Sequence, residues 1–111
     1  MTVVVSDTSV ITSLMTIGMD SILPTLYEHI LIPAAVEQEL RRAHEVLPAF
    51  LLTCSVRATE ELRARRQVLD AGEAEAIALA LEVRADLLLM DESRGRTVAT
   101  AAGLSINWVA D

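Results

Sequence analysis

Two short apolar runs that each end in an aspartate decide the fold: Val3-Val4-Val5-Ser6-Asp7 near the start of the chain and Asp86-Leu87-Leu88-Leu89-Met90-Asp91 near its end. Such runs are typical of parallel strands that are buried on both faces. In open α/β sheets, ligands bind outside the carboxyl ends of the strands, where the strand order reverses. We therefore expect Asp7 and Asp91 to meet there if their strands are neighbours. The alternative is that each aspartate caps the helix that follows it.

Hydrophobic periodicity predicts alternating strands and helices along the rest of the chain. Strands are expected at 2–6, 29–32, 52–56, 86–90 and 104–106, and helices at 9–16, 20–27, 33–44, 58–67, 71–83 and 93–102. This alternation indicates an α/β fold, a three-layer sandwich with a mostly parallel central sheet. The length of 111 residues suits a single domain over 1–111, and a hydrophobic content of 52% with 3% aromatic residues predicts an aliphatic core.

The predicted helix 33–44 carries an acid close to its apolar side. Pro33 is expected at the first helical position, where its missing N–H costs nothing. Glu39 lies at the border of the apolar stripe, about 70° from its centre. Glu39 is therefore the polar side chain of this helix that lies nearest to the core.

The predicted helix 71–83 is apolar nearly all round. Glu75 and Glu82 share its narrow polar face and are expected to face solvent. Glu73 points about 170° away from that face, and a charge that faces the core is costly unless it is paired or bound to a metal. The alternative role of Glu73 is local, because Asp70-Ala71-Gly72-Glu73 has the spacing of a capping box. Together, Asp7, Glu39, Glu73 and Asp91 suggest a divalent-metal site and phosphodiester chemistry.

Charge and composition limit the possible partners. The net charge of −7 argues against broad nonspecific binding of nucleic acid, although bound cations would offset part of it. Arg94 and Arg96 follow the Asp91 strand end and are candidates for binding substrate phosphates through their planar guanidinium groups; the alternative is a solvated helix face. Without an apolar run of membrane-spanning length or a signal-peptide pattern, the expected location is the cytoplasm, with no membrane partner.

Four segments, in order, carry a family resemblance. They are Val4-Val5-Ser6-Asp7-Thr8-Ser9, Ile32-Pro33-Ala34-Ala35-Val36-Glu37-Gln38-Glu39-Leu40, Gly72-Glu73-Ala74-Glu75-Ala76-Ile77-Ala78-Leu79-Ala80, and Leu88-Leu89-Met90-Asp91 followed by Arg96-Thr97-Val98-Ala99 and Gly103-Leu104. In these segments the chain resembles a PIN-domain nuclease. It is similar to the toxins of VapC-type toxin–antitoxin pairs and to a subgroup of short predicted nucleic-acid-binding proteins. The resemblance spans almost the whole chain.

The resemblance implies a metal-dependent ribonuclease that hydrolyses RNA phosphodiester bonds, as the toxin of a type II toxin–antitoxin system. Its catalytic acids match Asp7, Glu39, Glu73 and Asp91. Asp7, Glu73 and Asp91 would hold Mg²⁺ or Mn²⁺, while Glu39 would act directly or through a water molecule. Ser9 matches a family hydroxyl with a substrate-binding role, and its alternative role is to cap a helix. The implied partners are RNA, a small antitoxin protein and a second copy of the chain in a homodimer.

Two departures from the family pattern keep a second function open. After Ser105-Ile106 the family usually continues through a glycine-rich segment into further helix, whereas this chain reads Asn107-Trp108-Val109-Ala110-Asp111, so a domain with a short C-terminus is expected. The acid that follows Asp91 is the adjacent Glu92, while many relatives place it farther along. These departures suggest an incomplete metal shell with weak or lost activity. The alternative function is a noncatalytic PIN-like protein-interaction module with a vestigial metal site.

Overall fold

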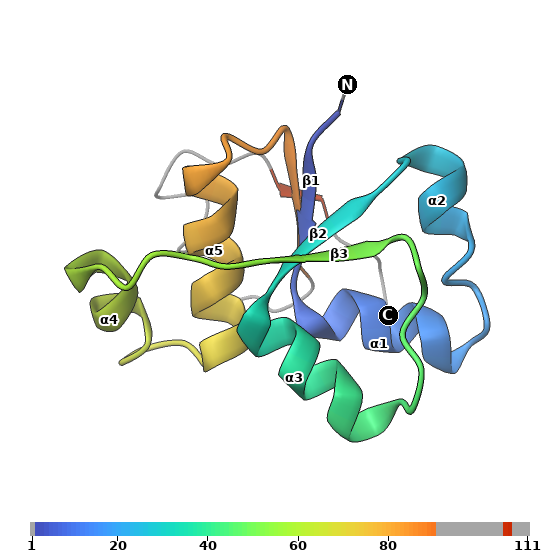
Figure 1. Cartoon of the computed structure of the whole chain (residues 1–111), viewed down its shortest axis with the longest axis horizontal. Helices are drawn as coiled ribbons and strands as arrows, with labels where there is room; N and C mark the ends of the chain where they lie inside the picture. Colours follow the sequence, from blue (N-terminus) through green and yellow to red (C-terminus); the bar gives the residue numbers. More distant parts are fainter. Residues whose placement is uncertain (1, 91–105, 108–111) are drawn as a thin grey trace.

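A central sheet of five strands runs through the molecule in the order β3-β2-β1-β4-β5 (Figure 1). In this computed structural model, residues 2–90 and 106–107 are described. The strands are β1 (Val4–Ser6), β2 (Ile30–Pro33), β3 (Leu51–Cys54), β4 (Leu87–Leu89) and β5 (Ile106–Asn107). Every neighbouring pair is parallel. The predicted α/β fold with a mostly parallel sheet is therefore confirmed.

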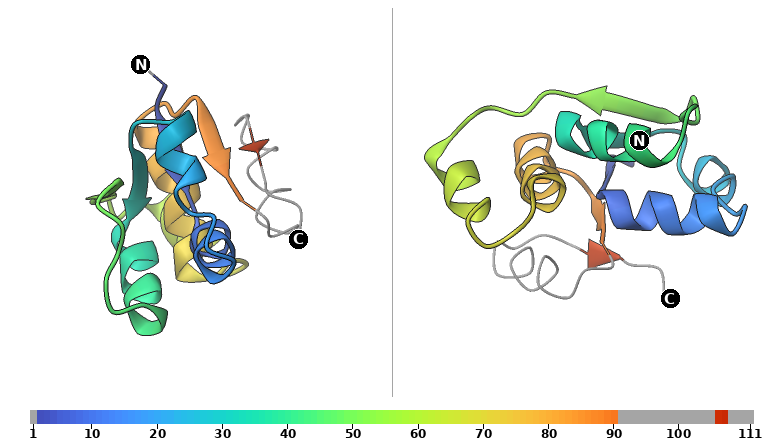
Figure 2. Two further views of the ribbon diagram at one scale, coloured as in Figure 1. Left: turned by 90° about the vertical axis from the view of Figure 1, so that its right-hand side faces the viewer. Right: turned by 90° about the horizontal axis from the view of Figure 1, so that it is seen from below.

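Helices cover both faces of the sheet. They are α1 (Thr8–Thr16), α2 (Ile22–Leu26), α3 (Ala34–Ala43), α4 (Glu60–Arg65) and α5 (Ala71–Glu82). Successive strand residues point to opposite faces, so Val4 packs in a cluster with α1, α2 and α3, whereas Val5 packs in a cluster with α4 and α5. Figure 2 shows α1 and α5 on opposite sides of β4. The result is the expected three-layer sandwich.

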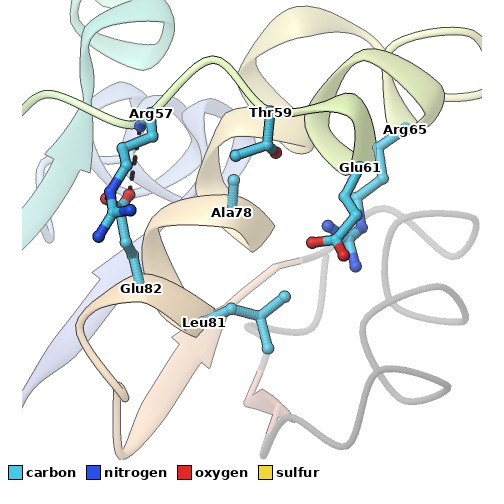
Figure 3. Close-up of a pocket in the computed structure, with 7 residues that line it drawn as sticks. All are labelled: Arg57, Thr59, Glu61, Arg65, Ala78, Leu81 and Glu82. Carbon is cyan, nitrogen blue, oxygen red and sulfur yellow. Dashed lines mark hydrogen bonds and ion pairs between the residues drawn. The ribbon is translucent and has the colours of Figure 1, made fainter.

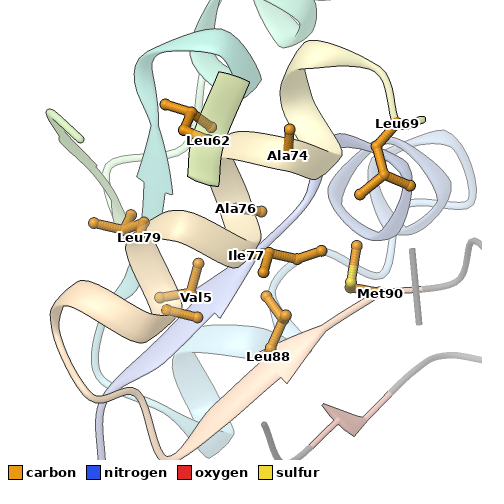
Figure 4. Packing of buried hydrophobic residues seen from close by; sticks show 10 residues of the cluster. Val5, Leu62, Leu69, Ala74, Ala76, Ile77, Leu79, Leu88 and Met90 are labelled. Carbon is orange, nitrogen blue, oxygen red and sulfur yellow. The ribbon is translucent and has the colours of Figure 1, made fainter. Parts of the chain in front are cut away.

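The core is aliphatic, as the composition predicts. Strand residues with 0% exposure occur on both faces of the sheet: Val4, Val5, Ile30, Ile32 and Leu88. In Figure 4, Ile77 of α5 lies against Val5 of β1 and Leu88 of β4. Because these strands are covered on both faces, their sequences read as continuous apolar runs rather than as an alternation.

Pro33 corrects the predicted start of α3. It is the last residue of β2, pairs in register with Cys54 of β3, and precedes the first helical residue, Ala34. Its φ of −78° and ψ of 167° are extended. A proline accepts this conformation easily, since its ring restricts φ and leaves an extended ψ open. The predicted helix 93–102, Gly103 and Trp108 lie outside the described residues.

No helix in the described part of the chain combines the length and apolar character needed to cross a membrane.

Candidate functional site

Asp7 stands at the carboxyl end of β1, where the strand order reverses. From β1 the chain leads to β2 on one side, while β4 pairs with β1 on the other. The backbone N–H of Asp7 donates to the carbonyl of Leu89 (3.1 Å), and Asp7 Oδ1 accepts the backbone N–H of Val10 (3.1 Å). Asp7 is only 1% exposed. The carboxylate therefore lies at the carboxyl end of β1, as predicted, and it caps α1; its role in metal binding remains a prediction.

The predicted site residues near the end of the chain follow β4. Asp91, Arg94 and Arg96 lie outside the described residues. The two residues before Asp91 are described: Leu89 of β4 pairs with Ser6 of β1, and Met90 has 0% exposure. The strand before Asp91 therefore runs beside the strand before Asp7, which is the condition under which the two aspartates were expected to meet.

Glu39, in the middle of α3, contacts the first turns of two other helices, α1 and α5. Its Oε1 accepts the hydroxyl of Thr8 at 2.5 Å, and Thr8 directly follows Asp7. On its other side the same oxygen lies so near to Gly72 of α5 that a Cβ added there would be 2.1 Å from it. Gly72 directly precedes Glu73. The Glu39 carboxylate is thus enclosed between the residues that adjoin two other predicted site acids.

Glu73 takes part in the capping box that its spacing allows. Its backbone N–H donates to Asp70 Oδ1 (2.9 Å), and Glu73 Oε1 accepts the backbone N–H of Asp70 (3.3 Å). The side chain is half-buried. The capping interpretation is confirmed by these bonds, while a role of the same carboxylate in metal binding remains a prediction.

Glu75 corrects the expectation that it faces solvent. It is 7% exposed, Oε1 accepts the backbone N–H of Ala35 (3.2 Å), and Oε2 forms an ion pair with Arg66. Helical periodicity correctly separates this face of α5 from the apolar one. It does not reveal that the start of α3 and the Arg66 side chain cover the polar face. The sequence signal for this burial was Arg66, nine residues before Glu75, because a buried carboxylate needs a cation or hydrogen-bond donors.

Ser9 is not the cap of the first helix. Asp7, with φ −85° and ψ −178°, holds the N-cap position of α1, and Ser9 lies inside the first turn. An aspartate and a serine are both good caps, and only the position at which the backbone turns helical distinguishes them. The capping role foreseen for Ser9 is therefore wrong, and its substrate-binding role remains a prediction.

Two hollows lie beside α5. The first, about 270 Å³, lies between α4 and the second half of α5 (Figure 3). It is lined by Arg57, Thr59, Glu61, Arg65, Ala78, Leu81 and Glu82. The Arg57–Glu82 ion pair, 3.3 Å, borders it. The second, about 500 Å³, lies at the starts of α3 and α5, and Arg66 and Glu75 line it. Of the predicted site acids within the described residues, none lines either hollow.

The donor chemistry fits a hard divalent cation. The four predicted site acids offer carboxylate oxygens, which are the ligands that Mg²⁺ and Mn²⁺ prefer. Within 2–90 and 106–107, however, no three acidic, histidine or cysteine side chains gather closely enough to hold a metal ion. A set of three such ligands would therefore need a side chain outside the described residues. Asp91 is the acid that would complete it.

Comparison with known proteins agrees with this geometry. A family model described as a PIN domain matches residues 3–109, nearly the full length of the chain. PIN domains are in general nucleases, and divalent metals are typical of them. No curated protein matches the chain. The family match and the parallel sheet agree, and the chain belongs to the PIN-domain family.

Proposed function

We propose that this PIN domain is a metal-dependent ribonuclease that hydrolyses RNA phosphodiester bonds. The observation that carries the proposal is the Glu39 carboxylate, which accepts the Thr8 hydroxyl and lies against Gly72. Through these neighbours the elements that bear Asp7, Glu39 and Glu73 converge at one end of the sheet. That end is where the strand order reverses and where α/β folds bind ligands.

Each acid has a distinct part in the proposed reaction. Asp7, Glu73 and Asp91 would hold Mg²⁺ or Mn²⁺, which supplies an activated water and a counter-charge for the leaving oxygen. The cap bond to Val10 fixes Asp7 in place. Because Glu39 accepts the Thr8 hydroxyl, its carboxylate is oriented and can receive a proton from the attacking water directly or through a second water.

Ser9, Arg94 and Arg96 are the proposed substrate-binding residues. Arginine binds phosphate oxygens in a bidentate manner, and a serine hydroxyl donates a single hydrogen bond to them. The position of Ser9, two residues after Asp7 in the first turn of α1, supports this assignment, because it places Ser9 near the carboxyl end of β1. These three contacts would hold the RNA backbone against an otherwise acidic surface.

We further propose that the chain is the cytoplasmic toxin of a type II toxin–antitoxin pair, that a small antitoxin protein binds it, and that it forms a homodimer. Support comes from large apolar side chains that stay exposed between residues 17 and 26: Ile17 (63%), Met19 (49%), Ile22 (42%) and Leu26 (62%). Apolar side chains gathered on a surface mark interaction sites. The same observation favours the noncatalytic interaction module as the second candidate.

Metal binding and RNA cleavage together separate the two candidates. Wild-type protein is compared with Asp7→Asn and Asp91→Asn, in which an amide of the same size replaces the carboxylate. The amide oxygen introduced at position 7 would still accept the Val10 N–H, so the fold is expected to persist. Glu45→Gln, an exposed acid beyond α3, is the matched control. Binding of Mn²⁺ and Mg²⁺ is measured by calorimetry, and cleavage is measured on labelled RNA with each metal and with EDTA.

We expect wild type and Glu45→Gln to bind Mn²⁺ and to cleave RNA, and both aspartate variants to lose cleavage. We expect Asp7→Asn to lose Mn²⁺ binding as well. Retained cleavage in Asp91→Asn would contradict the proposed site. Binding of Mn²⁺ by wild type without cleavage of any RNA would favour the noncatalytic module with a vestigial ion site.

A further inference from the structure

Glu75 is a buried acid that the proposed reaction does not use. It is 7% exposed and has two polar partners from different parts of the chain, the backbone N–H of Ala35 and the Arg66 guanidinium. Arg66 is the C-cap residue of α4, and its side chain is 48% exposed, so it reaches in from the surface. Burying a carboxylate is unfavourable without such partners. This arrangement therefore calls for a reason beyond filling the core.

The contact with Ala35 completes the start of α3. Pro33 occupies the N-cap position and makes no side-chain cap hydrogen bond, so α3 lacks a cap of its own. The first N–H groups of a helix have no partner within the helix. Glu75 Oε1 accepts one of them from Ala35 at 3.2 Å. A carboxylate from α5 thus does for α3 what an aspartate at position 33 would do, and its negative charge also suits the positive end of the helix.

The same helix pair sets the position of Glu39. Ala35 and Glu39 are four residues apart and lie on one face of α3, while Gly72 and Glu75 are three residues apart and lie on one face of α5. Ala35 contacts Glu75, and Glu39 contacts Gly72. These contacts are successive steps along one interface between α3 and α5. A shift at the first contact is therefore passed to the second, about 6 Å away along the helix.

We propose that Glu75, held by Arg66, is a positioning residue that sets where the Glu39 carboxylate lies relative to Thr8 and Gly72. It acts through α3 and touches neither RNA nor metal. The effect on cleavage rests on the proposed ribonuclease function, whereas the effect on α3 does not. The two can therefore be measured separately.

The test compares Glu75→Ala, which removes the acceptor, with Glu75→Gln, which keeps an oxygen able to accept the Ala35 N–H. Glu82→Gln is the matched control, because Glu82 lies on the same face of α5 and also pairs with an arginine, Arg57. Each substitution is also made in a Glu39→Gln background. Amide exchange of Ala35 and the carboxyl ¹³C shift of Glu39 are measured by NMR, and RNA cleavage is measured in single turnover with Mn²⁺.

We expect Glu75→Ala to accelerate exchange at Ala35, to move the Glu39 carboxyl signal and to lower cleavage about 10- to 100-fold, as losses of supporting contacts typically do. For Glu75→Gln, we expect Ala35 exchange, the Glu39 carboxyl signal and the cleavage rate to stay close to those of wild type. Glu82→Gln is expected to change none of the three. In the Glu39→Gln background, Glu75→Ala should cause little further loss of cleavage. A residue that only stabilises the fold would lower cleavage in both backgrounds.

Unchanged Ala35 exchange and an unchanged Glu39 signal in Glu75→Ala would overturn the proposal. A loss of cleavage that is equally large with Glu39→Gln would also overturn it, since the effect would then not pass through Glu39. If wild type cleaves no RNA, the ribonuclease function fails instead. The two NMR signals then decide the positioning role by themselves.

Discussion

Gly72 offers the sharpest test of where the Glu39 carboxylate lies. Gly72 is in the first turn of α5 and does not need the conformational freedom of glycine, because the positive φ angles among the described residues belong to Gly18 and Arg84. What it provides is space: an added Cβ would be 2.1 Å from Glu39 Oε1 and 3.0 Å from Glu39 Cδ. Gly72→Ala must therefore displace the carboxylate.

The magnitude follows from two opposing terms. Alanine in place of glycine favours a helix by about 0.5–1 kcal/mol. Displacing Glu39 sacrifices its hydrogen bond with Thr8, and bonds to charged groups contribute about 1.5–3 kcal/mol. We expect a net loss of about 1 kcal/mol in the free energy of unfolding. If Glu39 is first replaced by alanine, the obstacle is gone, and Gly72→Ala should stabilise the protein by about 0.5–1 kcal/mol. The sign of the effect thus depends on residue 39.

Urea unfolding of four proteins measures this coupling: wild type, Gly72→Ala, Glu39→Ala and the double variant. The loss of the Thr8 hydrogen-bond partner occurs in both proteins that carry Glu39→Ala, so it cancels from the comparison. If Gly72→Ala stabilised wild type as much as it stabilised the Glu39→Ala protein, the Glu39 carboxylate would not lie against Gly72. The inferred convergence of α1, α3 and α5 would then be wrong.

Substitutions at three further positions test local parts of the fold by urea unfolding. Thr8→Val removes the hydroxyl that binds Glu39 and should cost about 1–2 kcal/mol, with Thr8→Ser as the matched control, which should stay close to wild type. Thr59 caps α4 through the N–H of Leu62 (3.1 Å), so Thr59→Ala should cost about 1 kcal/mol and leave Mn²⁺ binding unchanged; a loss of Mn²⁺ binding would link α4 to the site. Ile77 has 0% exposure, so Ile77→Ala should lower the free energy of unfolding by about 2–5 kcal/mol and Ile77→Val by about 0.5–1.5 kcal/mol. Equal losses in the two variants would contradict the packing of Ile77 against the sheet.

Local sequence predicts much of the framework because strand and helix signals are short-range. The runs that end at Asp7 and Asp91 identify β1 and β4 because strands buried on both faces have to be apolar throughout. The spacing from Asp70 to Glu73 identifies a helix start and its capping box, which the structure confirms. The predicted ends of strands and helices differ from the observed ones by at most two residues. At Pro33, for example, the last residue of β2 and the first turn of α3 compete for the same backbone.

Within the described residues, the sequence by itself therefore determined the elements, their alternation and the placement of Asp7 at a strand end. Only the tertiary structure decided what each helix face meets. Glu75 is buried because α3 and Arg66 cover its side of α5. Glu39 lies against Gly72 because α3 and α5 pack together. The physical reason is that helical periodicity specifies the direction of a side chain relative to its own helix. The partner in that direction comes from a distant segment, whose position depends on the packing of the whole chain.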